Sequence, residues 1–289
     1  MHQLAIGSAQ FGLAYGIANR NGKTALREVG RILGVARSAG VDTIDTAVAY
    51  GDSETALGDI GLQGWHVVSK IPAIPPGQAD VAEWVLRSVR SSLKRLRTDK
   101  LAGLLLHRPG DLVGAAGEEL LCGLMRVKAE GLAEKIGVSV YGPDEIVSAK
   151  KWFLPDLVQI PFNPVDQRAV RSGAISELCR EGVEVHIRSV FLQGLLLMPA
   201  GTRPVFFDRW SGIWELWNRW LSENSLTPLQ VCLRFALQQH GISRVVIGVE
   251  SAEQLEEVLA AADGVLPVLP EEVQCSEDEL VNPSLWQKT

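Results

Sequence analysis

The chain has 289 residues, of which 46% are hydrophobic and 21% are charged, a composition typical of globular proteins. Its net charge of −6, with lysine and arginine scattered along the chain, offers no basic surface for nucleic acid. No apolar run approaches the roughly 20 residues that span a bilayer, and the first residues lack the cationic stretch of a signal peptide. We therefore expect a cytoplasmic protein that binds neither nucleic acid nor a membrane.

The cysteines are widely spaced and form no C-x-x-C pair, which argues against a metal site or a disulfide framework. They are Cys122, Cys179, Cys232 and Cys275. Reduced thiols are the ordinary state of such cysteines in the cytosol. We expect no bound metal.

Short β-branched segments alternate with longer segments of helical period along the whole chain. The predicted strands are 4–9, 41–47, 65–71, 101–108, 135–141, 156–163, 183–191 and 243–249. The predicted helices are 24–38, a short one from Ser53, 79–96, 117–130, one after Pro143, 167–181, 213–223, 227–240 and 251–262. Eight apolar strands, each followed by a helix, indicate one (β/α)8 TIM barrel domain over residues 1–289. An open doubly wound sheet is disfavoured because its usual glycine-rich turn is missing after the first strand.

The segment between strands 7 and 8 is longer than one helix requires. Residues 192–212 are predicted to form a long loop over the barrel mouth. Trp214, Trp217 and Trp220 repeat at helical spacing, which favours a core-facing stripe. Phe207 and Trp210 lie nearer the loop, and a second interpretation has them stacking on a sugar ring.

Polar residues fall at the carboxyl ends of three consecutive strands, where (β/α)8 barrels carry their chemistry. The second strand ends at Asp45 with Tyr50 just beyond it, the third at Lys70 and the fourth at His107. Each alone has a structural interpretation, such as a helix cap, a packed phenol, a surface lysine or a core histidine. Together they indicate a site, because a buried Lys70 would need a partner and Asp45 is the nearest choice.

These four side chains suit proton donation to a carbonyl. A phenol with a pKa of ~10 is a weak acid at neutral pH. We expect the Lys70 ammonium to lower the pKa of Tyr50, Asp45 to keep Lys70 charged, and His107 to orient a carbonyl oxygen. Because no side chain supplies hydride, a nicotinamide cofactor is implied.

The motifs "DTAVAYG", "VVSKI" and "LLLHRP", in this order, resemble the aldo-keto reductases, and the resemblance runs the length of the chain. It implies that Tyr50 is the general acid–base, Lys70 and Asp45 its tuning pair, and His107 the substrate-orienting residue. It also implies NADP(H) or NAD(H) as cofactor and a small-molecule carbonyl compound as substrate.

The same resemblance implies cofactor contacts at Ser139, Gln159, Arg188, Ser189, Gly194, Gly248, Glu250 and Ser251. The chain departs from the family at Val140, where an Asn is common, and at Arg188, where an aromatic ring is common. Arg188 has two interpretations: its guanidinium stacks on the nicotinamide, or it pairs with a carboxylate at the mouth.

Glu250 stands where members that prefer NADPH commonly carry Lys or Arg. A carboxylate there would repel a 2′-phosphate and accept hydrogen bonds from ribose hydroxyls, which makes NADH a candidate. Ser251 has a structural interpretation too, since Ser251 with Gln254 fits a capping box.

The segments "GSAQFGLAYGIAN" and "LVNPSLW" are similar to aldo-keto reductases associated with bacterial surface polysaccharide and sugar pathways. The similarity implies a sugar or sugar derivative as substrate and a C-terminal tail over the barrel mouth. Trp286 in that tail has two interpretations, packing and substrate contact.

Two other functions fit the same residues. A cofactor-binding regulatory module on the reductase fold is suggested by the departures at Val140, Arg188 and Glu250. A Schiff-base lyase would use the Lys70 amine, although Asp45 would keep that amine charged and Tyr50 would have no part. The sequence favours no oligomeric state.

Overall fold

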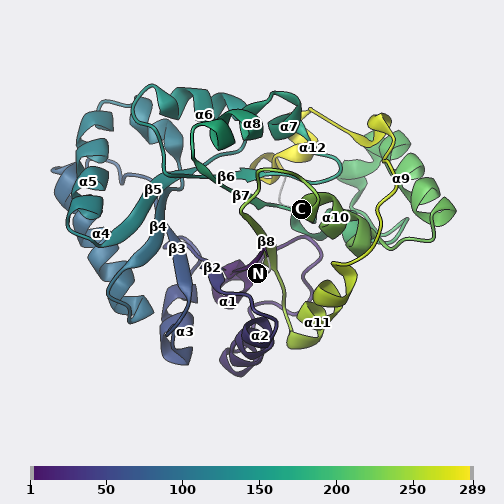
Figure 1. Ribbon diagram of the computed structural model, residues 1–289, viewed down its shortest axis with the longest axis horizontal. Coiled ribbons are helices and arrows are strands. Elements are labelled where there is room, and N and C mark those ends of the chain that lie inside the picture. Colours follow the sequence, from purple (N-terminus) through teal and green to yellow (C-terminus); the bar gives the residue numbers. More distant parts are fainter. Residues whose placement is uncertain (1–2, 287–289) are drawn as a thin grey trace.

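The computed structural model describes residues 3–286, and its eight parallel strands close into a barrel (Figure 1). Each strand pairs with the next along the chain, and the last pairs with the first, so the barrel sheet has no edge. The strands are β1 (Leu4–Gly7), β2 (Thr43–Asp45), β3 (His66–Ile71), β4 (Leu101–Leu106), β5 (Ala133–Ser139), β6 (Leu157–Pro161), β7 (Glu184–Arg188) and β8 (Arg244–Gly248). The predicted (β/α)8 barrel is confirmed; only β5 begins outside its predicted range, two residues early.

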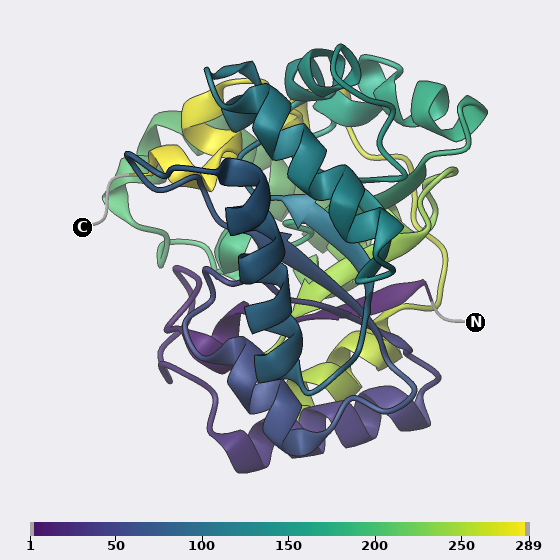
Figure 2. The same cartoon turned by 90° about the vertical axis from the view of Figure 1, so that its left-hand side faces the viewer.

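Helices surround the barrel (Figures 1 and 2). They are α1 (Ala9–Gly12), α2 (Leu26–Ser38), α3 (Ser53–Ile60), α4 (Val81–Leu96), α5 (Gly117–Ala129), α6 (Pro143–Lys150), α7 (Arg168–Arg171), α8 (Ala174–Arg180), α9 (Ser211–Glu223), α10 (Pro228–Leu237), α11 (Ala252–Ala261) and α12 (Asp278–Val281). The prediction of one helix over 167–181 is wrong, because the chain breaks into α7 and α8 at Gly173, whose φ is +78°.

The barrel interior is apolar in the middle and polar at the rim. Val68, Leu105 and Leu157 form a small cluster of their own, separate from the large core between barrel and helices. Side chains along a strand alternate between faces. Lys70 and Gln159 stand two positions after Val68 and Leu157, so they point into the same interior above this apolar layer. Both are fully buried.

A buried carboxylate ties β3, α3 and α4 together. Glu54 in α3 accepts hydrogen bonds from Ser69 (2.7 Å), from Ser92 and from the Arg95 guanidinium (2.6 and 2.9 Å). Its four bonds compensate for the cost of removing a carboxylate from water. The clamp holds α3 against the barrel, and α3 is the helix that follows the Tyr50 turn.

The segment after β7, predicted as a long loop over 192–212, contains short helices. It contains the 3₁₀ helices η2 (Leu192–Leu197) and η3 (Val205–Trp210), followed by α9, and the tryptophans of α9 at 214, 217 and 220 are buried as predicted. Phe207 and Trp210 are also buried, so the sugar-stacking interpretation is wrong for both. Their aromatic faces are used by packing, since Phe207 meets the Trp286 ring edge-on at 4.9 Å between centroids.

The C-terminal tail crosses the rim over the segments that follow β6 and β7. It contains η4 (Glu271–Val273), α12 and η5 (Pro283–Leu285). The Cys275 amide donates to the Val165 carbonyl (2.9 Å), and the Trp210 indole donates to Glu277 (3.2 Å). Trp286 packs on Phe207, in agreement with the packing interpretation. All four cysteines are free thiols.

Replacing Glu54 by alanine should destabilise the fold by about 3 kcal/mol, because it leaves the Arg95 guanidinium and two hydroxyls without their acceptor. Urea unfolding followed by tryptophan fluorescence measures this. Glu256→Ala, at an exposed position of α11, is the matched control and should change stability by less than about 0.5 kcal/mol. Equal losses in the two variants would contradict a structural role for the clamp.

Candidate active site

Lys70 lies at the centre of the rim with its amine fully buried. Its Nζ donates to Asp45 Oδ1 (2.6 Å) and to the Thr46 carbonyl (3.0 Å), and lies 3.5 Å from Tyr50 Oη. An ammonium has three donors, and this geometry leaves the third one facing the phenol. The structure therefore brings Asp45, Tyr50 and Lys70 together.

A close backbone approach positions Tyr50. A Cβ on Gly12 in α1 would lie only 1.8 Å from the Tyr50 carbonyl oxygen, so only glycine fits there. The turn continues through Gly51, which has a φ of +58°. Ser53 then anchors the start of α3 by donating to the Ser8 carbonyl (2.9 Å).

A chain of hydrogen bonds extends from the ion pair to β5 and β6. The Gln159 amide donates to Asp45 Oδ2 (2.7 Å), and the Ser139 hydroxyl donates to Gln159 Oε1 (3.1 Å). All three side chains are buried. Two of the residues predicted to contact the cofactor thus belong to the same network as Lys70.

His107 faces Tyr50 across the mouth. The two rings meet edge-on, with centroids 5.8 Å apart and an interplanar angle of 83°. Burial, with the positive charges of Lys70 and Arg188, lowers the pKa of His107 from 6.5 to about 4. The imidazole is therefore neutral at physiological pH.

The prediction that Lys70 lowers the pKa of Tyr50 is wrong for this structure. Burial raises the pKa of Tyr50 above its ordinary value, and the negative charge of Asp45 raises it further. Asp45 neutralises Lys70 at 2.6 Å, so the pair presents little net positive charge to the phenol. Burial also lowers the pKa of Lys70, against the opposing effect of Asp45. Tyr50 is a protonated phenol at neutral pH.

Arg188 lies at the end of β7 on the rim. Its guanidinium donates to the Val140 carbonyl (3.0 Å) and to Ser189 Oγ (3.1 Å), and stacks over the Tyr141 ring at 4.5 Å. Among residues 3–286 no carboxylate lies within ion-pair distance of it, so the pairing interpretation is wrong. Its positive charge remains available to a ligand at the mouth.

The loops after β1 and β7 touch each other beside the mouth. Ser189, Gln193 and Gly194 adopt left-handed conformations, and a Cβ on Gly194 would lie 2.6 Å from the Ala18 side chain. Gln193 donates to the Tyr15 hydroxyl (3.2 Å). Tyr15 was not predicted as a site residue, although its place just after the first strand end is a rim position.

The end of β8 and the start of α11 lie further along the rim, away from Lys70. Gly248 is exposed, with the Gln10 side chain close to where a Cβ would be. Ser251 caps α11 by accepting from the Gln254 backbone amide (3.2 Å). The predicted capping box is only half formed, because the Gln254 side chain accepts from the Glu250 amide (2.8 Å) and not from that of Ser251. Glu250 accepts from the Asn21 side chain (3.1 Å).

The first amide of α11 is already occupied by a carboxylate. The Ala252 amide donates to Glu28 Oε1 of α2 (2.7 Å), and Arg31 bridges Glu28 (2.9 Å) and Glu253 (2.6 Å). Helices α2 and α11 lie side by side in both views (Figures 1 and 2). Glu28 was not predicted, because on the sequence it is one more charge on an exposed helix face.

Within residues 3–286, no three His, Cys, Asp or Glu side chains are grouped so as to hold a metal ion. Over the same part of the chain, every helix is too short or too polar to cross a bilayer.

Comparisons with known proteins relate the chain to reductases. An aldo-keto reductase of Mycolicibacterium smegmatis is 30% identical over 154 residues, covering 50% of this chain and 52% of that protein. The L-glyceraldehyde 3-phosphate reductase of Escherichia coli is 24% identical over 217 residues, covering 66% of this chain and 62% of that protein. The chain thus spans about half the length of the first relative and under two thirds of the second.

A solved structure supports the fold. The holo form of an aldo-keto reductase from Bacillus halodurans superposes with a TM-score of 0.71 at 20% identity, covering 94% of this chain and 89% of that one. The model of the aldo/keto reductase family matches residues 3–273, which is most of the chain. This protein belongs to the aldo/keto reductase family.

Proposed function

We propose that this protein is a nicotinamide-dependent oxidoreductase that reduces an aldehyde or ketone, with Tyr50 as the proton donor. The observation that carries the proposal is the buried contact of Lys70 with both Asp45 and Tyr50. Three side chains from two strands and a turn converge there, beside a neutral imidazole. Membership in the aldo/keto reductase family supports the same reaction.

The chain's own residues would move one proton. The raised pKa keeps Tyr50 protonated until a carbonyl oxygen gains negative charge, and that alkoxide is basic enough to take the proton. The third Lys70 hydrogen faces the phenol oxygen, so it would stabilise the phenolate as it forms. Neutral His107 would donate to the carbonyl oxygen and hold it beside Tyr50.

The rim residues fit a nicotinamide dinucleotide. Arg188 offers a guanidinium with no carboxylate partner among residues 3–286, and the exposed backbone of Gly248 lies at the end of β8, where barrels of this kind bind phosphates. The nicotinamide end would be held by Ser139, Gln159 and Arg188. The diphosphate would be held by Ser189, Gly194 and Gly248, and the adenosine ribose by Glu250 and Ser251. When bound, the cofactor supplies the hydride to the carbonyl carbon.

The charges at the start of α11 favour NADH over NADPH. Glu28, Glu250 and Glu253 surround this helix end, and Arg31 is already shared by two of them. A helix N-terminus attracts anions through its free amides, but Glu28 takes the Ala252 amide. A 2′-phosphate would meet three carboxylates, whereas an unmodified ribose could donate its hydroxyls to them.

A sugar or sugar derivative is the substrate class we propose. The Escherichia coli relative is named for reducing L-glyceraldehyde 3-phosphate, an aldehyde flanked by a hydroxyl. A Schiff-base reaction is disfavoured, because Asp45 at 2.6 Å favours the protonated form of Lys70, and an ammonium has no lone pair for attack.

Tyr50→Phe should lower kcat for reduction of 4-nitrobenzaldehyde by at least ~100-fold while cofactor affinity stays within about twofold, because only the proton donor is lost. Loss of cofactor absorbance measures turnover. Tyr15→Phe, which removes the other phenol beside the mouth, is the control and should retain most activity. A Tyr50→Phe enzyme with near-normal kcat would refute Tyr50 as the acid. Cofactor binding without turnover in the wild type would support the regulatory alternative.

Titration of tryptophan fluorescence should give a Kd for NADH about tenfold or more below that for NADPH. The reason is that the 2′-phosphate of NADPH is repelled by the carboxylates at the start of α11. The double variant Glu28→Gln/Glu250→Arg should narrow or reverse this ratio. Glu256→Gln, on the exposed face of the same helix, should leave it unchanged. Tighter NADPH binding by the wild type would mean that another residue holds the 2′-phosphate.

The His107 imidazole should titrate with a midpoint near 4, well below the ordinary 6.5, when followed by NMR. The reduction rate should therefore show no inflection from His107 between about pH 5.5 and pH 8. Because the folded pKa is below the unfolded one, stability should fall as pH drops from about 6.5 toward 4, and fall less in His107→Asn. A midpoint at or above 6.5 would contradict the burial and charge effects described here.

A further inference from the structure

A cavity of about 740 Å³ lies between the loop after β5, helix α7 and the C-terminal tail. We call it the side cavity, and its wall includes Gly142, Asp144, Gln167, Gln274, Ser276 and Asn282. Helix α12 of the tail, in yellow, lies beside α7 in Figure 1. Small-molecule sites have volumes of roughly 300–1,000 Å³, so the side cavity has the size of a ligand site.

The frame of the side cavity is held by one guanidinium. Arg168 donates to both carboxylate oxygens of Asp166 (2.8 and 3.0 Å), to the Tyr141 carbonyl (2.9 Å) and to Asp278 of the tail (2.7 Å). Glu145 accepts from the Tyr141 amide (2.5 Å) and fixes the loop after β5. Three segments are thus joined around the cavity, which favours a preformed site.

The lining is polar and nearly balanced in charge. Gln167, Gln274 and Asn282 each carry an amide, which both donates and accepts hydrogen bonds. The Arg171 guanidinium contacts the Gln274 amide oxygen (3.2 Å), and exposed Asp144 provides a negative charge to balance it.

Strongly charged ligands fit this lining poorly. An anion would meet Asp144, Glu145 and Asp278, while a cation would meet Arg168 and Arg171. The wall carries both polar and apolar surface, with Tyr141, Pro143 and Cys275 in its lining, and a sugar ring likewise has hydroxyls and C–H faces. A group with several hydroxyls, each a donor and an acceptor, matches the lining best.

Tyr141 is shared by the side cavity and the catalytic rim. It lines the cavity, and its ring lies under the Arg188 guanidinium at 4.5 Å. The side cavity is therefore connected to the catalytic rim through the contact between Tyr141 and Arg188.

We propose that the side cavity binds the uncharged, polyhydroxylated distal part of the substrate, such as a sugar ring. The inference rests on the proposed function, which supplies the carbonyl reduction at Tyr50. Hydroxyl groups remote from the carbonyl would be bound between the loop after β5, helix α7 and the C-terminal tail.

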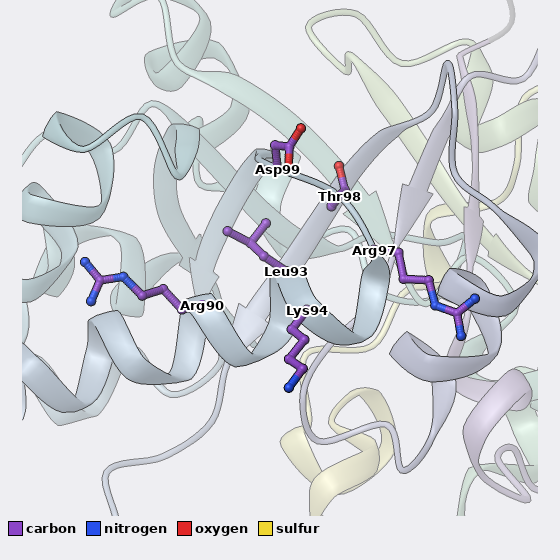
Figure 3. A pocket seen from close by; sticks show the side chains of 6 residues that line it. All are labelled: Arg90, Leu93, Lys94, Arg97, Thr98 and Asp99. Atoms are coloured by element: carbon purple, nitrogen blue, oxygen red, sulfur yellow. The ribbon is translucent and has the colours of Figure 1, made fainter.

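A smaller cavity elsewhere differs from the side cavity in the charge of its lining. About 350 Å³ in volume, it lies at the C-terminal end of α4, with Arg90, Lys94, Arg97 and Asp99 around it (Figure 3). Its residues precede β4, so it opens at the N-terminal end of the strands, opposite the catalytic rim. Three of its four charged residues are basic, unlike the balanced lining of the side cavity.

Sorbitol is a suitable probe, because it has the hydroxyls but no carbonyl and its binding needs no turnover. Saturation-transfer NMR should detect sorbitol on the wild type, and the signal should fall about fivefold or more in Ser276→Trp, which fills the cavity. Ser91→Trp, at an exposed position of α4, is the matched control and should bind like the wild type. In the wild type, sorbitol should shift the amide resonances of Gly142 and Ser276, a readout that requires no variant.

Equal sorbitol signals in all three proteins, or amide shifts absent from Gly142 and Ser276, would overturn the assignment. Stronger binding of gluconate than of sorbitol would overturn the neutral ligand class. If sorbitol does not bind at the side cavity while NADH binding and Tyr50-dependent reduction are observed, this inference is wrong and the proposed function stands. If NADH binding and carbonyl reduction are not observed while sorbitol shifts the amide resonances of the side cavity, the cavity binds hydroxyl groups but the proposed function is wrong.

Discussion

The ion pair between Lys70 and Asp45 is the interaction on which the rim depends. A fully buried ammonium is costly unless it is paired and hydrogen-bonded, and Lys70 meets that condition with Asp45 and the Thr46 carbonyl. Asp45 in turn accepts from Gln159, which connects β2 and β3 to β6 across the barrel. One charge pair therefore sets the positions of side chains from strands that are distant in the sequence.

The same pair reduces the positive charge at the mouth, because Asp45 offsets the charge of Lys70. Burial has the largest effect on the protonation states of the neighbouring side chains, and the remaining charges add to it. Tyr50 and His107 are both held in their neutral forms, one by a raised pKa and the other by a lowered pKa. A neutral acid and a neutral hydrogen-bond donor beside a buried cation suit a reaction in which negative charge develops on a carbonyl oxygen.

Charge differs from one part of the rim to another. At the end of β7, Arg188 has no carboxylate partner within the described residues, whereas Glu28, Glu250 and Glu253 make the start of α11 acidic. The side cavity, on the β5 and β6 side, is balanced. Under the proposed function, this arrangement would separate three kinds of recognition around the barrel rim: a carbonyl beside Tyr50, a dinucleotide without an added phosphate, and a group rich in hydroxyls.

The sequence by itself determined the barrel and the four residues at the strand ends, because period and strand count are local patterns that parallel closure converts into a shared rim. It predicted the partner of Lys70 correctly, since a buried ammonium needs a carboxylate. Only the tertiary structure decided the direction of the Tyr50 pKa, which is raised first by burial of the phenol and then by the negative charge of Asp45. Only it revealed Glu28 on the α11 amide and the Glu54 clamp, because contacts between helices far apart in the chain leave no periodic signal.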